Sequence, residues 1–207
     1  MHIFENIKTA MRFYFVLICV LAAGITHAQK HTNSAFKTYR QQYKNDLYEI
    51  IKEDTAHIAF YDFNPAMVVK AKVTLLKNEP VFKMTTSSGK TKDAQKYALL
   101  EFSLNGKPFR IFAYQLLMLK NKAETADDLF VPFTDLTCGK TSYGGGRYLD
   151  FKLKDIVNNQ LIIDFNKAYN PYCAFTSGYN CPIPPRENDI PFAIKAGEKY
   201  NADKFKH

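Results

Sequence analysis

Residues 97–117 read YALLEFSLNGKPFRIFAYQLL, and this stretch decides the fold. Two runs rich in aliphatic and aromatic residues, Tyr97–Leu104 and Lys107–Leu117, are separated only by Asn105 and Gly106. An Asn-Gly pair favours a two-residue turn between antiparallel strands, because both residues accept the positive φ angles that such a turn requires. The stretch therefore predicts a β-hairpin.

Further strands are predicted on both sides of this hairpin. Apolar residues alternate with Lys70, Lys72 and Thr74 in the run Met67–Leu76, which is typical of a strand with one face in water. The other predicted strands are Val81–Thr86, Leu129–Phe133, Tyr148–Leu153 and Leu161–Asn166, with Ile190–Lys195 as a short strand or a turn of helix. Thr86–Lys96, rich in Ser, Gly, Lys and Thr, is interpreted as an exposed loop.

One helix is predicted before the strands. In Asn33–Glu53 the apolar residues recur at steps of three and four, which indicates an amphipathic helix. Helical segments do not alternate with the strands, so a parallel α/β architecture is disfavoured. The fold class predicted is mainly β (β-rich α+β), an antiparallel barrel or sandwich of about seven strands with one N-terminal amphipathic helix.

The N-terminal residues have the pattern of a secretory signal peptide. Lys8 and Arg12 precede the apolar run Phe13–Gly24 of 12 residues, and Ala28 follows as a cleavage position. A bilayer needs about 20 apolar residues to be crossed by a helix, so no membrane span is expected. We predict a signal peptide over 1–28, one β-rich domain over 29–207, and release into the periplasm or the medium.

Composition narrows the possible partners. The chain of 207 residues is 46% hydrophobic and 23% charged, which excludes disordered, collagen-like and coiled-coil classes. Its net charge is +8, but the lysines are spread singly, as on a solvated surface. Export argues against nucleic acid as a partner, whereas weak attraction to anionic envelope lipids or polymers stays open.

Three cysteines remain after residue 28, namely Cys138, Cys173 and Cys181. An oxidising compartment favours one disulfide, and the spacing favours Cys173 with Cys181. A buried reduced pair and metal ligation are the alternatives. The C-x7-C spacing does not match a zinc knuckle and no fourth ligand is evident, so no metal is predicted.

The second half contains polar segments interrupted by Gly, Pro and Tyr, which are typical of ordered loops at the end of a sheet. If 148–153 is a strand, Arg147 shares the core face with Leu149 and needs a partner, because an unpaired buried charge is very unfavourable. Asp135 or Asp164 could form a structural ion pair with it. Alternatively, Arg147 and the backbone donors of Gly144–Gly146 could receive a carboxylate or phosphate of a ligand.

The sequence gives little support for a known catalytic or nucleotide-binding motif. Gly144–Gly146 lacks the spacing of either glycine-rich phosphate-binding motif. Asp164, Glu187 and Glu198 are not spaced as a catalytic pair, and Cys173 has no histidine nearby in sequence to act as its base. Whether the protein is an enzyme is therefore uncertain, and the cofactor is unknown.

Four motifs occur in order in the second half: DLTCGKTSYGGGRYL at Asp135–Leu149, DFNKAYNPYCA at Asp164–Ala174, CPIPPREN at Cys181–Asn188, and AGEK at Ala196–Lys199. Together they resemble the bacterial and archaeal domain-of-unknown-function family 1684. The resemblance implies a widespread, often exported single domain without an established activity. The matching positions that we nominate as a common ligand-binding site are Asp135, Arg147, Asp164, Asn166, Asn170, Glu187 and Asn188. Cys138 and Phe175 depart from the pattern of the family.

Three hypotheses follow for this cluster. In the first, an exported β-barrel-like domain binds a small polar or anionic ligand at one end through Arg147. In the second, carboxylates of the cluster serve a hydrolase-type enzyme. In the third, the cluster only fixes the loops of an envelope structural or interaction protein. The identity of the ligand and the oligomeric state stay open.

Overall fold

The computed structural model describes residues 34–205. The signal peptide predicted for 1–28 therefore lies outside the described residues. The chain divides into two compact units, Met1–Glu49 and Ile50–His207, and each is described by itself.

The described part of the first unit is helical, within a helix that covers residues 34–51. Within this unit the helix buries Phe36 and Leu47, and most of its other side chains are exposed, so the helix is amphipathic as predicted. The Arg40 guanidinium lies over the Phe36 ring, 4.0 Å from its centroid. This contact joins neighbouring turns of the helix.

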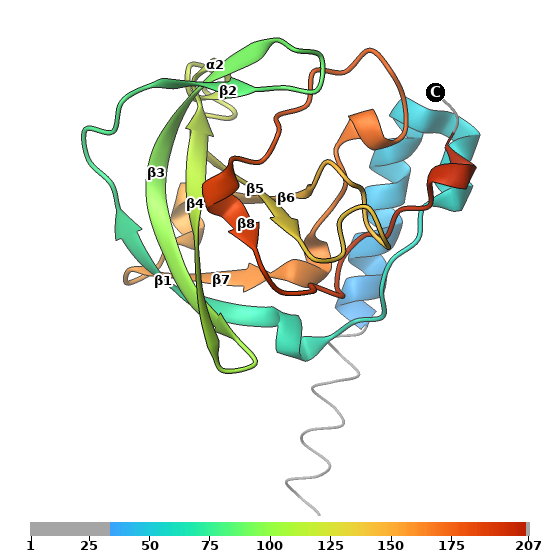
Figure 1. The fold of residues 1–207 in the computed structure, drawn as a ribbon, viewed down its shortest axis with the longest axis horizontal. Helices are drawn as coiled ribbons and strands as arrows, with labels where there is room; N and C mark the ends of the chain where they lie inside the picture. The colour runs from blue at the N-terminus through green and yellow to red at the C-terminus, as the bar shows by residue number, and fades with distance from the viewer. Residues whose placement is uncertain (1–33, 206–207) are drawn as a thin grey trace, which may run out of the picture. The chain divides into compact units, whose positions relative to one another are not determined.

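The second unit is built on one curled, mainly antiparallel sheet that forms a half-barrel (Figure 1). Its path is β6-β5-β4-β3-β1-β7, β2 pairs with β3, and β8 runs parallel to β5. The mainly β, antiparallel prediction is therefore confirmed. The strands are β1 Val68–Leu75, β2 Phe82–Thr85, β3 Thr91–Leu104, β4 Lys107–Leu116, β5 Asp128–Asp135, β6 Arg147–Lys152, β7 Gln160–Asp164 and β8 Asp189–Ile190.

Helical segments of this unit are short. One α-helical turn, α2 Leu117–Lys120, follows β4. The 3-10 segments are η1 Lys52–His57, η2 Pro65–Met67, η3 Leu153–Asp155, η4 Phe165–Lys167, η5 Tyr172–Ala174, η6 Arg186–Asn188 and η7 Ala202–Lys204. No helix within residues 34–205 is long and apolar enough to cross a membrane.

The hairpin predicted from residues 97–117 joins β3 and β4. Asn105 and Gly106 have φ angles of 48° and 74°, and Leu104 pairs with Lys107 across the turn. Two central residues with positive φ match the right-handed twist of the flanking strands. This prediction is confirmed.

Three predicted boundaries were wrong. Thr86–Lys96 is not an exposed loop throughout, because β3 begins at Thr91 and pairs with both β2 and β4. Its polar residues misled the prediction, although a strand tolerates them wherever its face is in water. The strand predicted for 161–166 ends at Asp164, and the one for 190–195 is only the two residues of β8.

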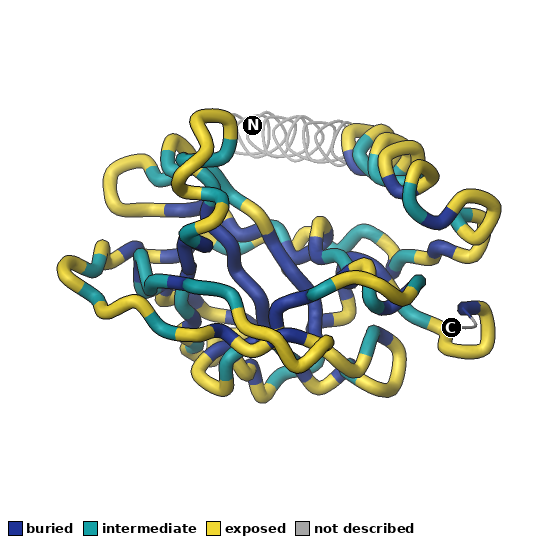
Figure 2. Tube along the Cα trace, turned by 90° about the horizontal axis from the view of Figure 1, so that it is seen from above, coloured by how far each residue is buried: buried dark blue, intermediate teal, exposed yellow. Residues whose placement is uncertain are grey.

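Both faces of the sheet are covered in its central part. The main core contains Leu100, Ile111, Phe133 and Leu149 among others, and a second cluster contains Ala94, Tyr114, Phe130 and Tyr148. Phe133 and Phe130, like Leu149 and Tyr148, differ in parity along their strands, so the two clusters lie on opposite faces. Figure 2 shows the buried segments running through the middle of this unit, with exposed turns around them.

A β-bulge between Lys96 and Ala98 determines which side chains of β3 reach each face. Ala94 belongs to the second cluster and Ala98 to the main core, although a spacing of four would place both on one face of a regular strand. The bulge therefore turns the first half of β3, including Lys92, toward the second cluster.

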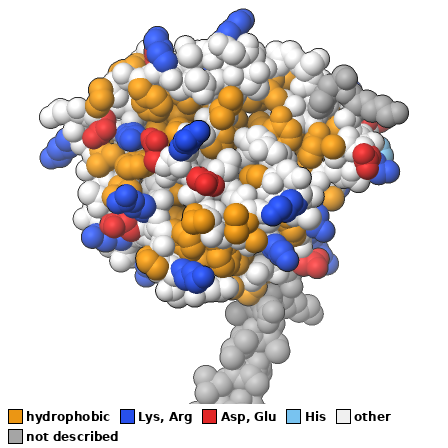
Figure 3. All heavy atoms as spheres, viewed as in Figure 1, with side chains coloured by type: hydrophobic (Ala, Val, Ile, Leu, Met, Phe, Trp, Pro, Cys, Tyr) orange, Lys and Arg blue, Asp and Glu red, His pale blue; other side chains and the backbone are white. Residues whose placement is uncertain are grey.

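Basic side chains do not merge into one surface on the face seen in Figure 3. The Lys and Arg side chains there are separate patches among apolar, acidic and uncharged atoms. On that face the distribution agrees with a solvated surface and not with a continuous site for a polyanion.

Candidate functional site

Arg147, the first residue of β6, lies completely inside the protein. Its side chain and that of Asp135 are both 0% exposed, and Nη2 donates to Asp135 Oδ2 at 2.9 Å. Nη2 also donates to the Ile194 carbonyl at 2.9 Å, and Nη1 donates to the carbonyls of Ala196 and Glu198. The inward direction predicted for Arg147 is confirmed, and Asp135 is its partner.

Both oxygens of the Asp135 carboxylate accept hydrogen bonds. Its Oδ1 accepts from the backbone N–H and the hydroxyl of Thr137 at 3.1 and 2.6 Å, and its Oδ2 accepts from Ile194 N at 2.8 Å. A buried ion pair needs such additional hydrogen bonds to offset the loss of hydration. The pair joins β5, β6 and the segment at 194–198.

Asn170 is connected to this network through Glu198. Its backbone N–H donates to Glu198 Oε2 at 2.7 Å, and its amide donates to the Lys199 carbonyl at 3.0 Å. Glu198 is 0% exposed, as are Asn170 and Arg147. Two of the four sequence motifs thus meet the Arg147 motif in one buried network.

The remaining nominated residues form two other groups. The side-chain amide of Asn166 makes two hydrogen bonds with the backbone of Asn64. The Asn64 N–H donates to Asn166 Oδ1 at 2.8 Å, and Asn166 Nδ2 donates to the Asn64 carbonyl at 2.9 Å. Asp164 accepts from Asn166 N at 3.0 Å and caps η4. Strand alternation does not apply to Asn166, because the chain has already turned into η4.

Asn188 connects β4 to β5. Its amide donates to the carbonyls of Phe112 and Pro132 at 2.8 and 2.7 Å, and its Oδ1 accepts from Phe112 N at 2.7 Å. Among described residues β4 and β5 pair only at Tyr114 and Phe130. The side chain of Asn188 therefore supplies hydrogen bonds that a second strand would otherwise supply.

Glu187, beside Asn188, is partly exposed. Its Oε1 accepts from Lys96 Nζ at 3.0 Å and from the Tyr114 hydroxyl at 3.2 Å. Burial raises the pKa of Glu187, but the hydrogen bond and charge of Lys96 outweigh it, so the pKa lies below its ordinary value. The pKa of the Tyr114 hydroxyl is raised by burial and by the charge of Glu187.

The seven nominated residues thus occupy three hydrogen-bonded groups, not one open site. For Arg147 and Asp135 the geometry supports the structural ion pair, which the sequence left open beside the anion-receptor role. The ligand-binding role predicted for the seven residues stays a prediction.

An accessible pocket lies on the opposite face of the sheet. Its volume is about 420 Å³, and β3, β5, β6 and the segment 169–182 contribute to its walls. Apolar side chains of Leu116, Leu119 and Phe130 line it together with four tyrosines, Tyr148, Tyr169, Tyr172 and Tyr179. Its volume and mixed lining are those of small-molecule sites.

Asp150 supplies an acidic group to this pocket. It is solvent-exposed, and its Oδ2 accepts from the Tyr169 hydroxyl at 2.5 Å. Partial removal from water raises the pKa of Asp150 above its ordinary value, and the charge of Asp128 raises it further, against the lowering effect of the Tyr169 hydrogen bond. A carboxyl group that is accessible and still has a raised pKa is typical of a concave site.

The tyrosine hydroxyls nearest to Asp150 are held in place. Tyr148 donates to the Pro182 carbonyl, and its ring lies edge-on to Tyr169 with centroids 5.7 Å apart. Burial raises the pKa of both hydroxyls, so they stay protonated and act as donors at neutral pH.

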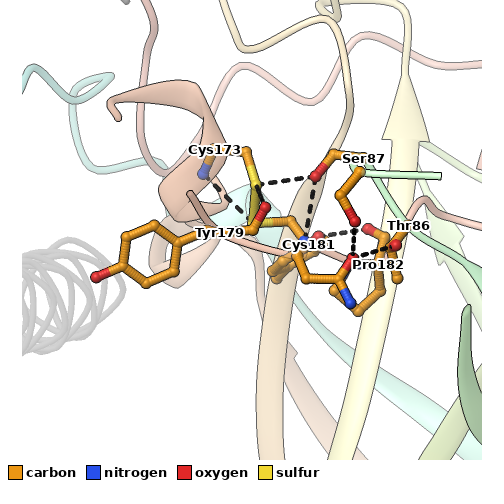
Figure 4. Close-up of a disulfide and its surroundings, with 9 residues drawn as sticks. Thr86, Ser87, Cys173, Tyr179, Cys181 and Pro182 are labelled. Atoms are coloured by element: carbon orange, nitrogen blue, oxygen red, sulfur yellow. Dashed lines mark hydrogen bonds between the residues drawn. A yellow bond between two sulfur atoms is a disulfide. The ribbon is translucent and has the colours of Figure 1, made fainter. Parts of the chain in front are cut away.

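The disulfide predicted between Cys173 and Cys181 is present and closes the wall formed by 172–181 (Figure 4). Ser87, in the β2–β3 turn, donates its N–H to the Cys181 carbonyl at 2.8 Å and accepts at its hydroxyl from Cys181 N at 3.2 Å. The disulfide therefore closes this segment into a covalent loop, and hydrogen bonds to Ser87 attach the loop to the β2–β3 turn. Tyr179 points away from these contacts in Figure 4.

Two further hollows are weaker candidates for a binding site. A wider one of about 1000 Å³ includes Lys70, Lys72 and Arg110, but the side chain of Lys72 is 75% exposed and is already paired with Glu101. Another of about 380 Å³ lies beside Gly144 and Tyr200. No group of His, Cys, Asp and Glu among the described residues could hold a metal ion.

Sequence reasoning missed Lys92, Asp150 and Tyr169 as site residues. Tyr169 lay inside a quoted motif and Asp150 directly after one. The strand parity of Asp150 with Tyr148 could have placed Asp150 on the face opposite Arg147. Lys92 carried no such signal, because its orientation depends on a bulge that the sequence does not mark.

Fold and site together define a mainly β protein, with a half-barrel sheet, a buried polar network on one face and a tyrosine-lined pocket on the other. The chain belongs to the family described as protein of unknown function (DUF1684), whose model matches residues 53–199. It is similar in structure to an uncharacterized protein of Haloarcula marismortui solved by NMR in solution, with a TM-score of 0.61 and 28% identity over 82% of this chain and 96% of that one. No curated protein matches it.

Proposed function

We propose that the protein is exported and binds a small organic molecule in the pocket around Asp150 and Tyr169. The observation that carries this proposal is the pocket itself, which is about 420 Å³ and has an accessible carboxyl group and bound tyrosine hydroxyls among apolar side chains. Apolar walls contribute affinity, and a few fixed polar groups select the orientation of a ligand. The polar network around Arg147 then serves as the scaffold behind the pocket.

The pocket is tested by filling it. Leu119 lines the pocket, whereas the neighbouring Met118 does not line it and is 52% exposed. A thermal-shift screen of metabolites and cell-wall fragments on residues 29–207 should yield ligands whose stabilisation is lost in Leu119→Trp and kept in Met118→Trp. If the screen finds no ligand, or if the ligands stabilise Leu119→Trp as much as the unaltered protein, binding in this pocket is ruled out.

Export is supported by the apolar run after Lys8 and Arg12, and the Cys173–Cys181 disulfide is typical of an oxidising compartment. We expect N-terminal sequencing of the protein recovered from the periplasm or the medium to begin at Gln29. Ile18→Arg, inside the apolar run, should keep the chain in the cytoplasm, whereas Ile3→Arg, before it, should not. Retention of the unaltered chain in the cytoplasm would refute export.

A hydrolase is the second candidate, favoured by one observation. Asp128 and Asp150 both line the pocket, and partial removal from water and the charge of Asp128 both raise the pKa of Asp150. Two carboxyls in one site can divide the roles of acid and base. Turnover of a chromogenic glycoside or ester that disappears in Asp150→Asn would support the enzyme, and binding without turnover would support the receptor.

A further inference from the structure

Lys92 contributes a positive charge to the pocket, and none of the described residues is its counter-ion. Its side chain is half-buried, burial lowers the pKa of its ammonium group, and no described residue forms an ion pair or hydrogen bond with that group. The nearest acidic residue in sequence, Asp93, is paired with Lys83 at 2.6 Å. A partly desolvated cation without a partner gains free energy when an anion reaches it.

Two other lysines on the same face of the sheet are already paired with carboxylates. Lys96 pairs with Glu187 at 3.0 Å and lies over the Phe112 ring, and Lys152 pairs with Asp128. Lys92 and Asp150 line the same pocket but form no ion pair with each other. The two charges are therefore available to different parts of one ligand.

We propose that the pocket takes a small organic acid, with a single carboxylate bound by Lys92 and an apolar, preferably aromatic, body that packs among Leu119, Phe130 and the tyrosine rings. The inference rests on the proposed function and gives that pocket its ligand class. The aromatic preference follows from the four tyrosines, since rings pack edge-to-face with additional stabilisation. Asp150 accepts a hydrogen bond from a hydroxyl group of the ligand and repels a second negative charge.

Three molecules that share one body test the class: 3-phenylpropanoate, 3-phenylpropan-1-ol and 3-phenylpropylamine. Calorimetry at neutral pH should show that the acid binds more tightly than either the alcohol or the amine. Lys92→Gln should weaken the acid by about tenfold or more, the loss of one charge-assisted contact, and leave the alcohol unchanged. Lys77→Gln, an exposed lysine outside the pocket, is the matched control.

The outcomes separate the two proposals. An alcohol or amine that binds as tightly as the acid, or an acid whose affinity is unchanged in Lys92→Gln, overturns the ligand class while leaving the pocket. If none of the three binds and the wider screen yields only neutral or cationic ligands blocked by Leu119→Trp, the class is also overturned. If the screen yields no ligand sensitive to Leu119→Trp, the proposed function itself fails.

Discussion

Arg147 and Asp135 illustrate how a charge pair becomes structural once both side chains lose contact with water. We expect Arg147→Met to lower the free energy of unfolding by about 3–5 kcal/mol, because Asp135 would remain buried without its counter-ion. Urea denaturation followed by circular dichroism measures the change. The double variant Arg147→Met with Asp135→Leu should recover part of the loss, since no charge is then left unpaired.

The control for this prediction is Arg110→Met, because Arg110 is an exposed arginine on the same sheet. It should change the free energy of unfolding by no more than about 0.5 kcal/mol. A loss below about 1 kcal/mol in Arg147→Met would contradict a structural role for the pair.

Asp150 makes a prediction about pH. Its pKa in the folded protein is raised above the unfolded value of about 3.9, so the native state binds more protons than the unfolded state between these two values. Stability should therefore fall as pH rises through that window. Asp150→Asn should remove this slope, and its stability relative to the unaltered protein should be greater at about pH 6 than at about pH 3.

Chemical denaturation at several pH values measures this difference, with Asp203→Asn, an exposed carboxylate, as the control. A pH profile of Asp150→Asn parallel to that of the unaltered protein would show that Asp150 titrates normally.

Individual residues were predictable from the sequence where strand parity controls them. Arg147 was placed inward by its parity with Leu149, and Asp135 was named as one of two partners. Asn188 was nominated from the motif alone. Its role between β4 and β5 depends on a gap in strand pairing that no local pattern reveals.

Among the elements, the segment 172–181 is a loop that the Cys173–Cys181 disulfide closes, and this closure should stabilise the folded protein. Cys173→Ser with Cys181→Ser should lower the free energy of unfolding by about 2–3 kcal/mol, because the unfolded chain regains the entropy of an open loop. The double variant should also weaken any ligand of the pocket, since Cys181 and Pro182 line it. Urea denaturation and calorimetry measure the two effects.

Thiol counting checks the premise of this experiment. Cys138 is the free cysteine of the described residues, so alkylation of the unreduced mature protein should label one thiol. Three labelled thiols would show that the disulfide is absent in solution.

The turn before β6 depends on Gly146. Its φ is 92°, and a Cβ there would lie 2.6 Å from Pro184 Cγ and 2.7 Å from the Phe133 carbonyl. Gly146→Ala should therefore destabilise the protein by about 2 kcal/mol or more, through both backbone strain and steric conflict. Gly89→Ala, at φ 77° with open space around it, should show only the strain and thus a smaller loss in thermal denaturation.

Element boundaries were predicted well where turn chemistry was explicit and poorly where it was not. Asn105 and Gly106 fixed the β3–β4 hairpin because their backbone preferences are local. The start of β3 at Thr91 was missed, because pairing with β2 up to Ala94 and with β4 from Ala94 onward holds polar residues in a strand regardless of their own preferences.

In the Ile50–His207 unit, one face of the sheet carries the buried polar network and the other face carries the accessible pocket. Successive residues of β6 alternate between a sealed ionic network, at Arg147, and the pocket, at Tyr148 and Asp150. The fold class followed from the spacing of strands and turns. Which face would stay open could not follow from it, because the bulge at Lys96 and the return of 169–182 over the sheet are long-range features.

Within the part of the chain that the structure describes, β4 and β5 pair at one position only, which leaves a seam beneath the pocket, since Leu116 belongs to β4 and Phe130 to β5. Backbone amides along such a seam exchange with deuterium sooner than those of the continuous β3–β4 hairpin. An occupant touching both strands would slow that exchange at positions it never contacts, including Phe112, which is bonded to Asn188. Deuterium uptake measured by mass spectrometry would thus reveal an occupied pocket before its occupant has been identified.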